Sequence, residues 1–303
     1  MRDYSVLDAA LNAVNIRYKI DEPMRLHTTF KIGGPADRFI IVESSGALQT
    51  VLRTLKDCDI SYMVLGNGSN MLVPDEGLRG AVLSLEGEFK QITLHEDNKI
   101  LCGGGATLAA LCNFARSNTL TGLEFAWGIP GEVGGALYMN AGAYGGEMKQ
   151  VTARVFYVDE DGRPGVYSGD ELQYGYRQSV FMGAKTVITK AEFVLEQGVE
   201  TEITALMDDL MQRRKSKQPV ELPSAGSVFK RPEGHFAGAL IEQCGLKGCT
   251  IGGARVSEKH AGFIVNVNNA TCADVEALIA HIQDVVMKET GVKLEPEVRS
   301  VRL

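Results

Sequence analysis

Cysteine and histidine are scarce in the sequence, and they do not occur at the spacings typical of metal ligands or redox dithiols. Six cysteines and five histidines are spread over 303 residues, without a C-x-x-C, H-E-x-x-H or H-x-H pattern. Metal centres, disulfide frameworks and thioredoxin-like sites usually carry such spacings. We therefore expect no metal site, and free thiols in a reducing compartment.

Long hydrophobic runs and an excess of positive charge are also absent. No apolar run reaches the roughly 20 residues that a helix needs to cross a bilayer, and the N-terminal stretch contains an early acidic residue. The net charge of −7 gives no general attraction to nucleic acid or to an anionic membrane. We expect a cytoplasmic, monomeric protein without a signal peptide, a membrane segment or a nucleic-acid partner.

The remaining composition is ordinary for a globular protein with substantial cores. Hydrophobic residues make up 45% and charged residues 23%, and 303 residues are enough for two or three structural units. Apolar periodicity predicts helices over residues 5–14, 48–55, 107–117, 201–215, 235–244 and 271–289. Alternation predicts strands over residues 37–43, 62–65, 81–85, 89–95, 99–102, 151–158, 186–195, 262–268 and 294–303. Thr107 and Thr271 are expected helix caps.

Two glycine-rich stretches, Gly66–Asn70 and Gly128–Gly135, suggest a bound anion. Glycine permits positive φ and lets backbone N–H groups approach a ligand closely. Met71 stands where a G-x-G-x-x-G motif needs its third glycine, and no G-x-x-x-x-G-K-[ST] motif occurs, so we expect neither a Rossmann site nor a P-loop. Each stretch alone is typical of a tight turn. Together they favour a dinucleotide held by backbone amides.

Six motifs occur in a recognisable order along the chain. They are HTTFKIGGPA (27–36), LGNGSNML (65–72), GIPGEVGGALYMNAGAYGGE (128–147), YGYRQSVF (174–181), PSAGSVFKRP (223–232) and LEPEVR (294–299). In these motifs the chain resembles the UDP-N-acetylenolpyruvoylglucosamine reductase (MurB) family over nearly its whole length. Only about 50 residues separate Arg177 from Ser227, which leaves little room for the inserted tyrosine loop of the longer family type. The chain is therefore similar to the shorter type.

The resemblance implies an α+β fold, with a two-part FAD-binding unit of the vanillyl-alcohol oxidase (PCMH) type and a C-terminal α+β substrate-binding domain. The expected division is residues 1–80, joined by the C-terminal strand 295–303, then 81–217, and then 218–294. The family holds FAD non-covalently and uses NADPH as co-substrate. It reduces the enolpyruvyl group of a UDP-sugar to give UDP-N-acetylmuramate for peptidoglycan.

The resemblance also implies roles for three residues. Hydride addition to the β-carbon of the enol ether leaves negative charge on the α-carbon and its carboxylate, which a guanidinium is suited to stabilise. Arg177 matches the family residue with this role, and Glu297 the residue that assists it. Ser227 matches the proton donor to the α-carbon. Taken without the family, Arg177 is better explained by a surface salt bridge and Ser227 by a turn or a helix cap, and Glu297 fits an exposed strand-end carboxylate.

The resemblance extends to the ligand contacts. Residues that match the family's FAD-contacting stretches are Gly66, Asn67, Gly68, Ser69, Asn70, Pro130, Gly134, Gly135, Asn140, Gly142 and Ala143. Basic and pocket residues expected at the UDP-sugar, together with Arg177, are Arg214, Lys217, Arg231 and His260. Arg214 and Lys217 fit a solvated basic helix end nearly as well.

Three alternatives compete with this interpretation. The first is another FAD-dependent oxidoreductase of the same fold; many of these attach flavin through a histidine in the first loop, and Gly66–Asn70 contains none. The second is a non-catalytic UDP-sugar binder, against which the joint presence of Arg177, Ser227 and Glu297 argues. The third is a serine hydrolase. The string AGSVF around Ser227 lacks the G-x-S-x-G nucleophile elbow, which disfavours it.

Overall fold

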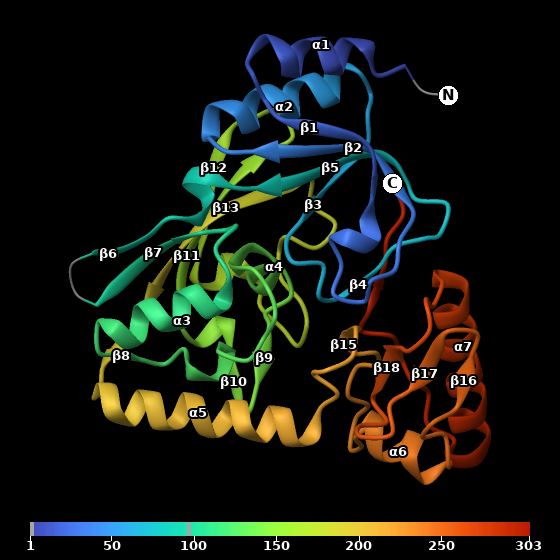
Figure 1. Cartoon of the computed structure of the whole chain (residues 1–303). Helices are drawn as coiled ribbons and strands as arrows, with labels where there is room; N and C mark the ends of the chain where they lie inside the picture. The colour runs from blue at the N-terminus through green and yellow to red at the C-terminus, as the bar shows by residue number, and fades with distance from the viewer. Residues whose placement is uncertain (1–2, 96–97) are drawn as a thin grey trace. The chain divides into compact units, whose positions relative to one another are not determined.

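The computed structural model describes residues 3–95 and 98–303 (Figure 1). The chain forms two compact units, each built from several segments. The first unit contains residues up to Lys19, Arg38–Gly66 and Ala81–Gln212, and the second contains Ile20–Asp37, Asn67–Gly80 and Arg213–Leu303. Since the chain passes between the units repeatedly, each unit has a core made of residues far apart in sequence.

One sheet has the strand order β1-β2-β5-β3, in which β3 runs parallel to β5. The strand β3 belongs to the first unit, whereas β1, β2 and β5 each have residues in both units. In Figure 1, α1 and α2 lie side by side over this sheet. Ser44 begins α2 by accepting a hydrogen bond from the N–H of Ala47 at 3.2 Å. The elements are β1 (Tyr18–Pro23), β2 (Pro35–Val42), β3 (Tyr62–Leu65), β5 (Leu78–Leu85), α1 (Ser5–Ala13) and α2 (Ser45–Asp57).

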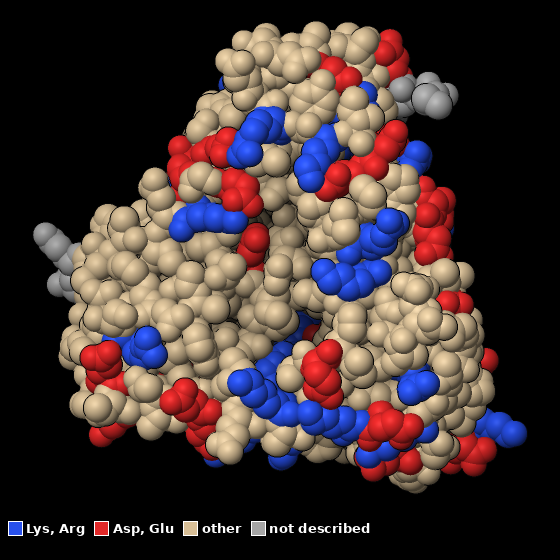
Figure 2. All heavy atoms as spheres, in the orientation of Figure 1, with Lys and Arg blue, Asp and Glu red and all other residues tan. Residues whose placement is uncertain are grey.

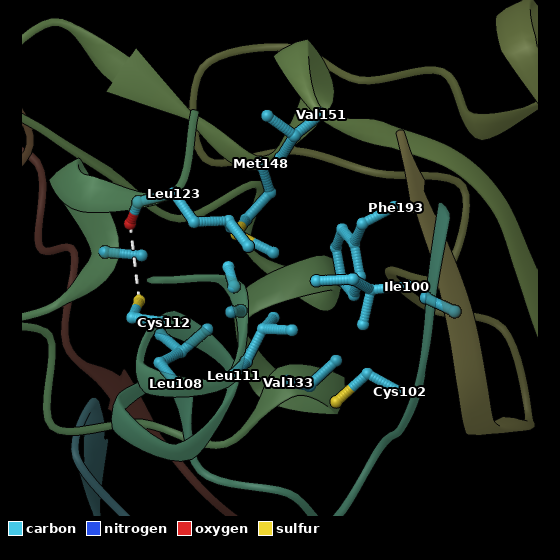
Figure 3. Packing of buried hydrophobic residues seen from close by; sticks show 14 of the residues in the cluster. Ile100, Cys102, Leu108, Leu111, Cys112, Leu123, Val133, Met148, Val151 and Phe193 are labelled. Carbon is cyan, nitrogen blue, oxygen red and sulfur yellow. Dashed lines mark hydrogen bonds between the residues drawn. The ribbon is translucent and has the colours of Figure 1, made fainter. Parts of the chain in front are cut away.

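A second, antiparallel sheet of the first unit has the order β12-β11-β13-β7-β6. Its core contains a large cluster of buried apolar side chains, and Figure 3 shows Leu111, Val133 and Phe193 among them. The strands are β6 (Ile92–His95), β7 (Lys99–Gly103), β11 (Thr152–Asp159), β12 (Pro164–Ser168) and β13 (Thr186–Val194). The remaining elements are α3 (Leu108–Ser117), α4 (Val133–Tyr138), β8 (Leu120–Thr121), β9 (Gly142–Ala143), β10 (Gly146–Glu147) and β14 (Glu196–Gln197). The helix α5 (Glu200–Lys217) begins in this unit, and its residues from Arg213 onward belong to the second unit.

The second unit is an antiparallel sheet of order β15-β18-β17-β16 with α6 and α7 packed against it. The strands are β15 (Ser224–Ser227), β16 (Thr250–Ile251), β17 (Ala254–Val256) and β18 (Phe263–Asn266), and the helices are α6 (Ala237–Gln243) and α7 (Cys272–Thr290). Phe30, Ile32 and Leu72 are buried in the same apolar cluster. A short parallel pair, β4 (Met71–Leu72) with β19 (Arg299–Ser300), joins early and late parts of the chain.

Short 3-10 helices punctuate both units at Met24–Leu26, Gly87–Lys90, Glu124–Ala126, Met148–Gln150 and Gly169–Leu172. Most expected helices and strands are confirmed within a few residues, including the caps at Thr107 and Thr271. Three expectations are wrong in part. Phe89 lies in a 3-10 turn rather than a strand, α6 starts only at Ala237, and within 294–303 only Arg299–Ser300 is a strand.

Within the described residues, no helix is both long and apolar enough to cross a membrane. The same part of the chain contains no group of three or more His, Cys, Asp or Glu side chains arranged to hold a metal ion. On the face in Figure 2, basic and acidic side chains are interspersed.

Candidate active site

Arg177 lies at the tip of a tight turn in the first unit. Gly175 and Gln178 exchange backbone hydrogen bonds at 3.1 and 3.2 Å, so Tyr176 and Arg177 form the loop between them. Arg177 adopts φ +53°, a left-handed conformation that is uncommon for a residue with a side chain. Its guanidinium lies 5.1 Å from the Tyr176 ring centre, and Nη2 donates to the carbonyl of Gly142 at 3.3 Å. The turn therefore presents the guanidinium beside the expected flavin-contacting stretch.

Asn140 ties that stretch to the Arg177 turn. Its side chain is fully buried, with Nδ2 donating to the carbonyl of Gly175 at 2.9 Å and to the Glu147 carboxylate at 2.7 Å. Its Oδ1 accepts from the N–H of Lys149 at 2.9 Å. Both Nδ2 hydrogens and Oδ1 of Asn140 are therefore bonded within the protein, and the Asn140 amide helps to hold the Arg177 turn in place. A direct contact from Asn140 to FAD stays a prediction.

The glycine-rich stretch on both sides of Asn140 has backbone that is open to a ligand. Gly135 lies inside α4 and Gly145 at φ +89°, and a methyl group on either would meet no atom within 4 Å. Their small size is therefore not required by the packing of the protein on itself, which fits a bulky cofactor near them. Gly134 is tighter, since a methyl group there would lie 3.1 Å from the carbonyl oxygen of Gly104. Gly142 and Ala143 are half-buried, whereas Pro130 is exposed.

The first glycine loop, Asn67–Asn70 in the second unit, is packed against the HTTFKIGGPA motif. Gly68 has φ +58°, and a methyl group on it would lie only 2.4 Å from the carbonyl oxygen of His27. The N–H of Thr29 donates to the carbonyl of Gly68 at 3.3 Å. Glycine is thus needed here for both conformation and space. Ser69 is half-buried in this loop. Gly66, the residue before the loop, belongs to the first unit.

Ser227 and Glu297 lie on adjoining segments of the second unit. The N–H of Glu297 donates to the carbonyl of Val228 at 2.7 Å, so the backbone of Glu297 is bonded to the residue that follows Ser227. The pairing of β15 with β18 is irregular between Ser224 and Ser227, and Gly226 there has φ +76°. Such irregularities turn a side chain away from the sheet. Ser227 is exposed, and its hydroxyl accepts or donates no hydrogen bond within residues 3–95 and 98–303.

The first glycine loop also contacts both of these segments. The Asn70 side chain donates to the carbonyl of Glu297 at 3.3 Å, and the N–H of Arg299 donates to the carbonyl of Asn70 at 3.1 Å. The Thr29 hydroxyl donates to the carbonyl of Ser224 at 2.7 Å. The expected cofactor loop and the expected proton donors are therefore parts of one hydrogen-bonded assembly.

The expected substrate cations are distributed along the same unit. Arg214 and Lys217 lie in the last turn of α5, half-buried and exposed respectively. Arg231 is exposed, with its guanidinium 4.0 Å from the ring centre of Phe236, which is itself 61% exposed. An exposed aromatic ring beside a cation is suited to a planar base and a phosphate group. Phe236 was not among the residues expected from the sequence, because a single aromatic residue before a helix carries no pattern.

His260 has a partly structural environment. Its Nδ1 accepts a hydrogen bond from the N–H of Gly262 at 3.1 Å, and its ring meets that of Phe263 edge-on at 5.0 Å. Burial lowers the pKa of His260, so the neutral ring is favoured at physiological pH. The carbonyl of Gly262 accepts from the N–H of Val228 at 2.9 Å, which connects His260 to the Ser227 segment. Its contact with substrate stays a prediction.

Two protein-family models match the chain. Residues 36–164 match the family described as FAD binding domain, and residues 218–301 match the UDP-N-acetylenolpyruvoylglucosamine reductase C-terminal domain. The reductase of that name from Caldanaerobacter subterraneus is 48% identical over 282 residues, which is 93% of each chain. The one from Clostridioides difficile is 44% identical over 296 residues, covering 96% of this chain and 97% of the relative. The chain belongs to the UDP-N-acetylenolpyruvoylglucosamine reductase family.

A solved structure agrees with this assignment. The crystal structure of the reductase (MurB) from Thermus caldophilus superimposes with a TM-score of 0.79 at 36% identity, covering 94% of this chain and 98% of that one. The α+β fold with an FAD-binding unit and a C-terminal reductase domain is thereby confirmed. The chain is an FAD-dependent oxidoreductase of this family, with NADPH as reductant, and the hydrolase and non-catalytic interpretations are wrong.

Proposed function

We propose that the chain reduces the enolpyruvyl group of UDP-N-acetylenolpyruvoylglucosamine with Arg177, Ser227 and Glu297 as its catalytic residues. The observation that carries the proposal is the hydrogen bond from Glu297 N–H to the Val228 carbonyl, 2.7 Å long. It joins the backbone of Glu297 to the residue that follows Ser227, whose hydroxyl is exposed and has no partner in the described part of the chain. When bound, FAD supplies the hydride and accepts it from NADPH.

Ser227 is proposed to give a proton to the substrate α-carbon. Hydride addition to the β-carbon makes the α-carbon a strong base, so a hydroxyl is a sufficient acid. The position of the hydroxyl is set by backbone on both sides, because Gly226 turns the chain and Val228 is paired to Gly262. Glu297 is proposed to stabilise the developing charge and to assist proton delivery to the serine oxygen afterwards.

Arg177 is proposed to bind the substrate carboxylate and stabilise the enolate that forms on it. A guanidinium keeps its charge at any physiological pH and presents two parallel donors to a carboxylate. The left-handed turn and the bond to the Gly142 carbonyl restrict where this group can lie. Preorganisation of this kind lowers the barrier because the donor need not reorient as charge develops.

The remaining assignments are proposals of the same kind. Arg214, Lys217 and Arg231 bind the diphosphate of the UDP-sugar, and His260 lines its pocket. The glycine-rich stretches containing Gly66–Asn70 and Pro130–Ala143 bind FAD without a covalent bond. We also propose the division into residues 1–80 with 295–303, 81–217, and 218–294, and a cytoplasmic monomer.

The two half-reactions test the catalytic roles separately. In Ser227→Ala, NADPH should still bleach the flavin absorbance at the wild-type rate, since no proton is given to carbon in that half. Reoxidation by the enolpyruvyl sugar should slow by a factor of about 10²–10⁴, the usual contribution of a general acid. Ser224→Ala, in the same strand, is the matched control and should leave both halves intact. A Ser227→Ala protein that reoxidises normally disproves the donor role.

A further inference from the structure

Glu132 lies in the glycine-rich stretch Gly128–Gly135, and its side chain lies against Gly66, the residue before the first glycine loop. It precedes α4, and a methyl group in place of the Gly66 hydrogen would lie 3.1 Å from its Oε2 and 3.3 Å from its Cβ. Gly66 and Glu132 both belong to the first unit. The side chain thus fills the space that a side chain at Gly66 would occupy.

The Glu132 carboxyl has no partner that explains its place. It stands at the N-cap of α4 but makes no capping hydrogen bond. Within residues 3–95 and 98–303 it forms no side-chain hydrogen bond and no ion pair. A half-buried carboxylate without donors is costly, so either the group is neutral or a ligand meets it.

The surrounding charges do not hold Glu132 in its ionised form. Burial is the largest effect on it and raises its pKa to about 7. Lys90 lowers that pKa and Glu86 raises it, so the two oppose each other. Lys90 is itself paired with Glu86, with Nζ to Oε2 at 2.6 Å. Near neutral pH, a substantial fraction of the molecules therefore carries a neutral carboxylic acid beside Gly66.

A neutral acid at this place suits FAD and a carboxylate does not. The segment 36–164 that matches an FAD binding domain contains both Gly66 and Glu132. FAD brings a diphosphate, which carries negative charge and accepts hydrogen bonds. A neutral carboxylic acid donates one, whereas a carboxylate only accepts and repels a nearby anion.

We propose that Glu132 is a cofactor-binding residue. Its carboxyl group binds FAD when the carboxyl is neutral and weakens FAD binding when the carboxyl ionises. FAD therefore binds tightly at acidic and neutral pH, and its affinity falls as the pH rises through the titration of this group. Bound FAD in turn favours the protonated carboxyl, because binding and protonation are linked. The proposal depends on FAD binding and not on the roles of Arg177, Ser227 and Glu297.

The dissociation constant (Kd) of FAD is measured at each pH by diluting the holoprotein and determining the free FAD that passes an ultrafiltration membrane. If only the neutral form of Glu132 binds, the wild-type Kd rises about 30-fold between pH 6 and pH 8.5, for a pKa near 7. In Glu132→Gln, which stays neutral, the Kd should be flat over this range and low at pH 8.5. A flat wild-type profile, or the same rise in Glu132→Gln, would overturn the proposal.

Two variants that leave Glu132 in place make the test independent of its substitution. Lys90→Met removes a neighbouring cation and should move the rise in Kd to higher pH. Glu86→Gln removes a neighbouring carboxylate and should move the rise to lower pH. Both keep the full rise. If neither variant moves the rise, a different group causes it and Glu132 does not have this role, even where Glu132→Gln fails to fold.

Discussion

At the scale of single residues, the proposed function depends on side chains held in unusual places by their neighbours. Arg177 has a left-handed backbone, and it keeps that conformation because the turn is over-determined by contacts around it. Asn140 supplies one of these contacts through the Gly175 carbonyl, and Ser179 supplies another by donating to the Tyr138 carbonyl at 2.7 Å. A conformation that costs energy alone is thereby stabilised by the surrounding hydrogen bonds.

The first residue-scale prediction concerns Asn140. Asn140→Ala removes the bonds to Gly175, Glu147 and Lys149 and leaves buried polar groups unpaired, at a cost on the order of 3 kcal/mol in unfolding free energy. Denaturant titration measures this loss. The reoxidation half-reaction should slow more than flavin reduction, because the displaced group is the Arg177 turn. The partly buried Asn118, which donates to the Phe114 carbonyl at 2.7 Å, gives the control Asn118→Ala.

For the Asn140 prediction, the balance between the half-reactions is decisive. A variant that loses stability while both half-reactions keep their rates would show that Asn140 is only a structural residue. Asn140→Asp keeps an acceptor for Lys149 but loses the donor to Gly175. Its rates should resemble those of the alanine variant, since the donor is the group that holds the turn.

How much of the site the sequence predicts also differs from residue to residue. Arg177, Ser227 and Glu297 are predicted only because ordered motifs resemble a family, since none of them has a neighbour in sequence that reveals its chemistry. Phe236 and Glu132 are not predicted from the sequence. Whether a lone aromatic residue is exposed, or a lone carboxyl is buried, depends on parts of the chain that a local pattern does not include.

At the scale of elements, the well-predicted ones are those whose signal is local. The helix α7 has a regular apolar face, a cap at Thr271 and a terminating Gly291 at φ +71°, and its bounds are found to within a residue. The poorly predicted ones depend on distant partners. The strand β19 is two residues long because only those residues meet β4, so an extended pattern over 294–303 overestimates it.

The prediction at this scale concerns the start of α7. Asp75 accepts hydrogen bonds from the N–H groups of Cys272 at 2.8 Å and Ala273 at 3.1 Å, from a segment almost 200 positions earlier. Asp75→Ala should lower the unfolding free energy by about 1–2 kcal/mol, as the loss of a helix cap does, and the melting temperature by a few degrees.

Glu76→Ala is the matched control for Asp75, since it removes an adjacent acidic side chain without a bond to these amides. Scanning calorimetry on the holoprotein compares the two. Equal melting temperatures for Asp75→Ala and wild type would show that the carboxylate does not cap the helix in solution.

At the scale of the whole molecule, the second unit cannot be cut out as one piece of chain. Its apolar cluster contains Phe30, Ile32 and Leu72 in addition to residues after Ala225, and all three are at most 2% exposed. Asn266, whose Nδ2 donates to the Phe30 carbonyl at 3.1 Å, is similarly satisfied from outside the C-terminal region.

We predict that the fragment 218–303 does not fold cooperatively alone. It lacks three large core side chains, each of which contributes on the order of 2–4 kcal/mol to a core of this size. Circular dichroism and amide exchange should show helix without a sharp thermal transition. A cooperative transition would contradict this.

The pairing of β4 with β19 also bears on the order in which the protein is made. The N–H of Arg299 donates to Asn70 and the N–H of Val301 donates to Leu72, so the last strand completes the neighbourhood of the first glycine loop. The Asn70 side chain is likewise bonded to the carbonyl of Glu297, 227 positions later. Because a nascent chain leaves the ribosome N-terminus first, the loop at Asn67–Asn70 cannot make these bonds until the segment 297–301 has been synthesised.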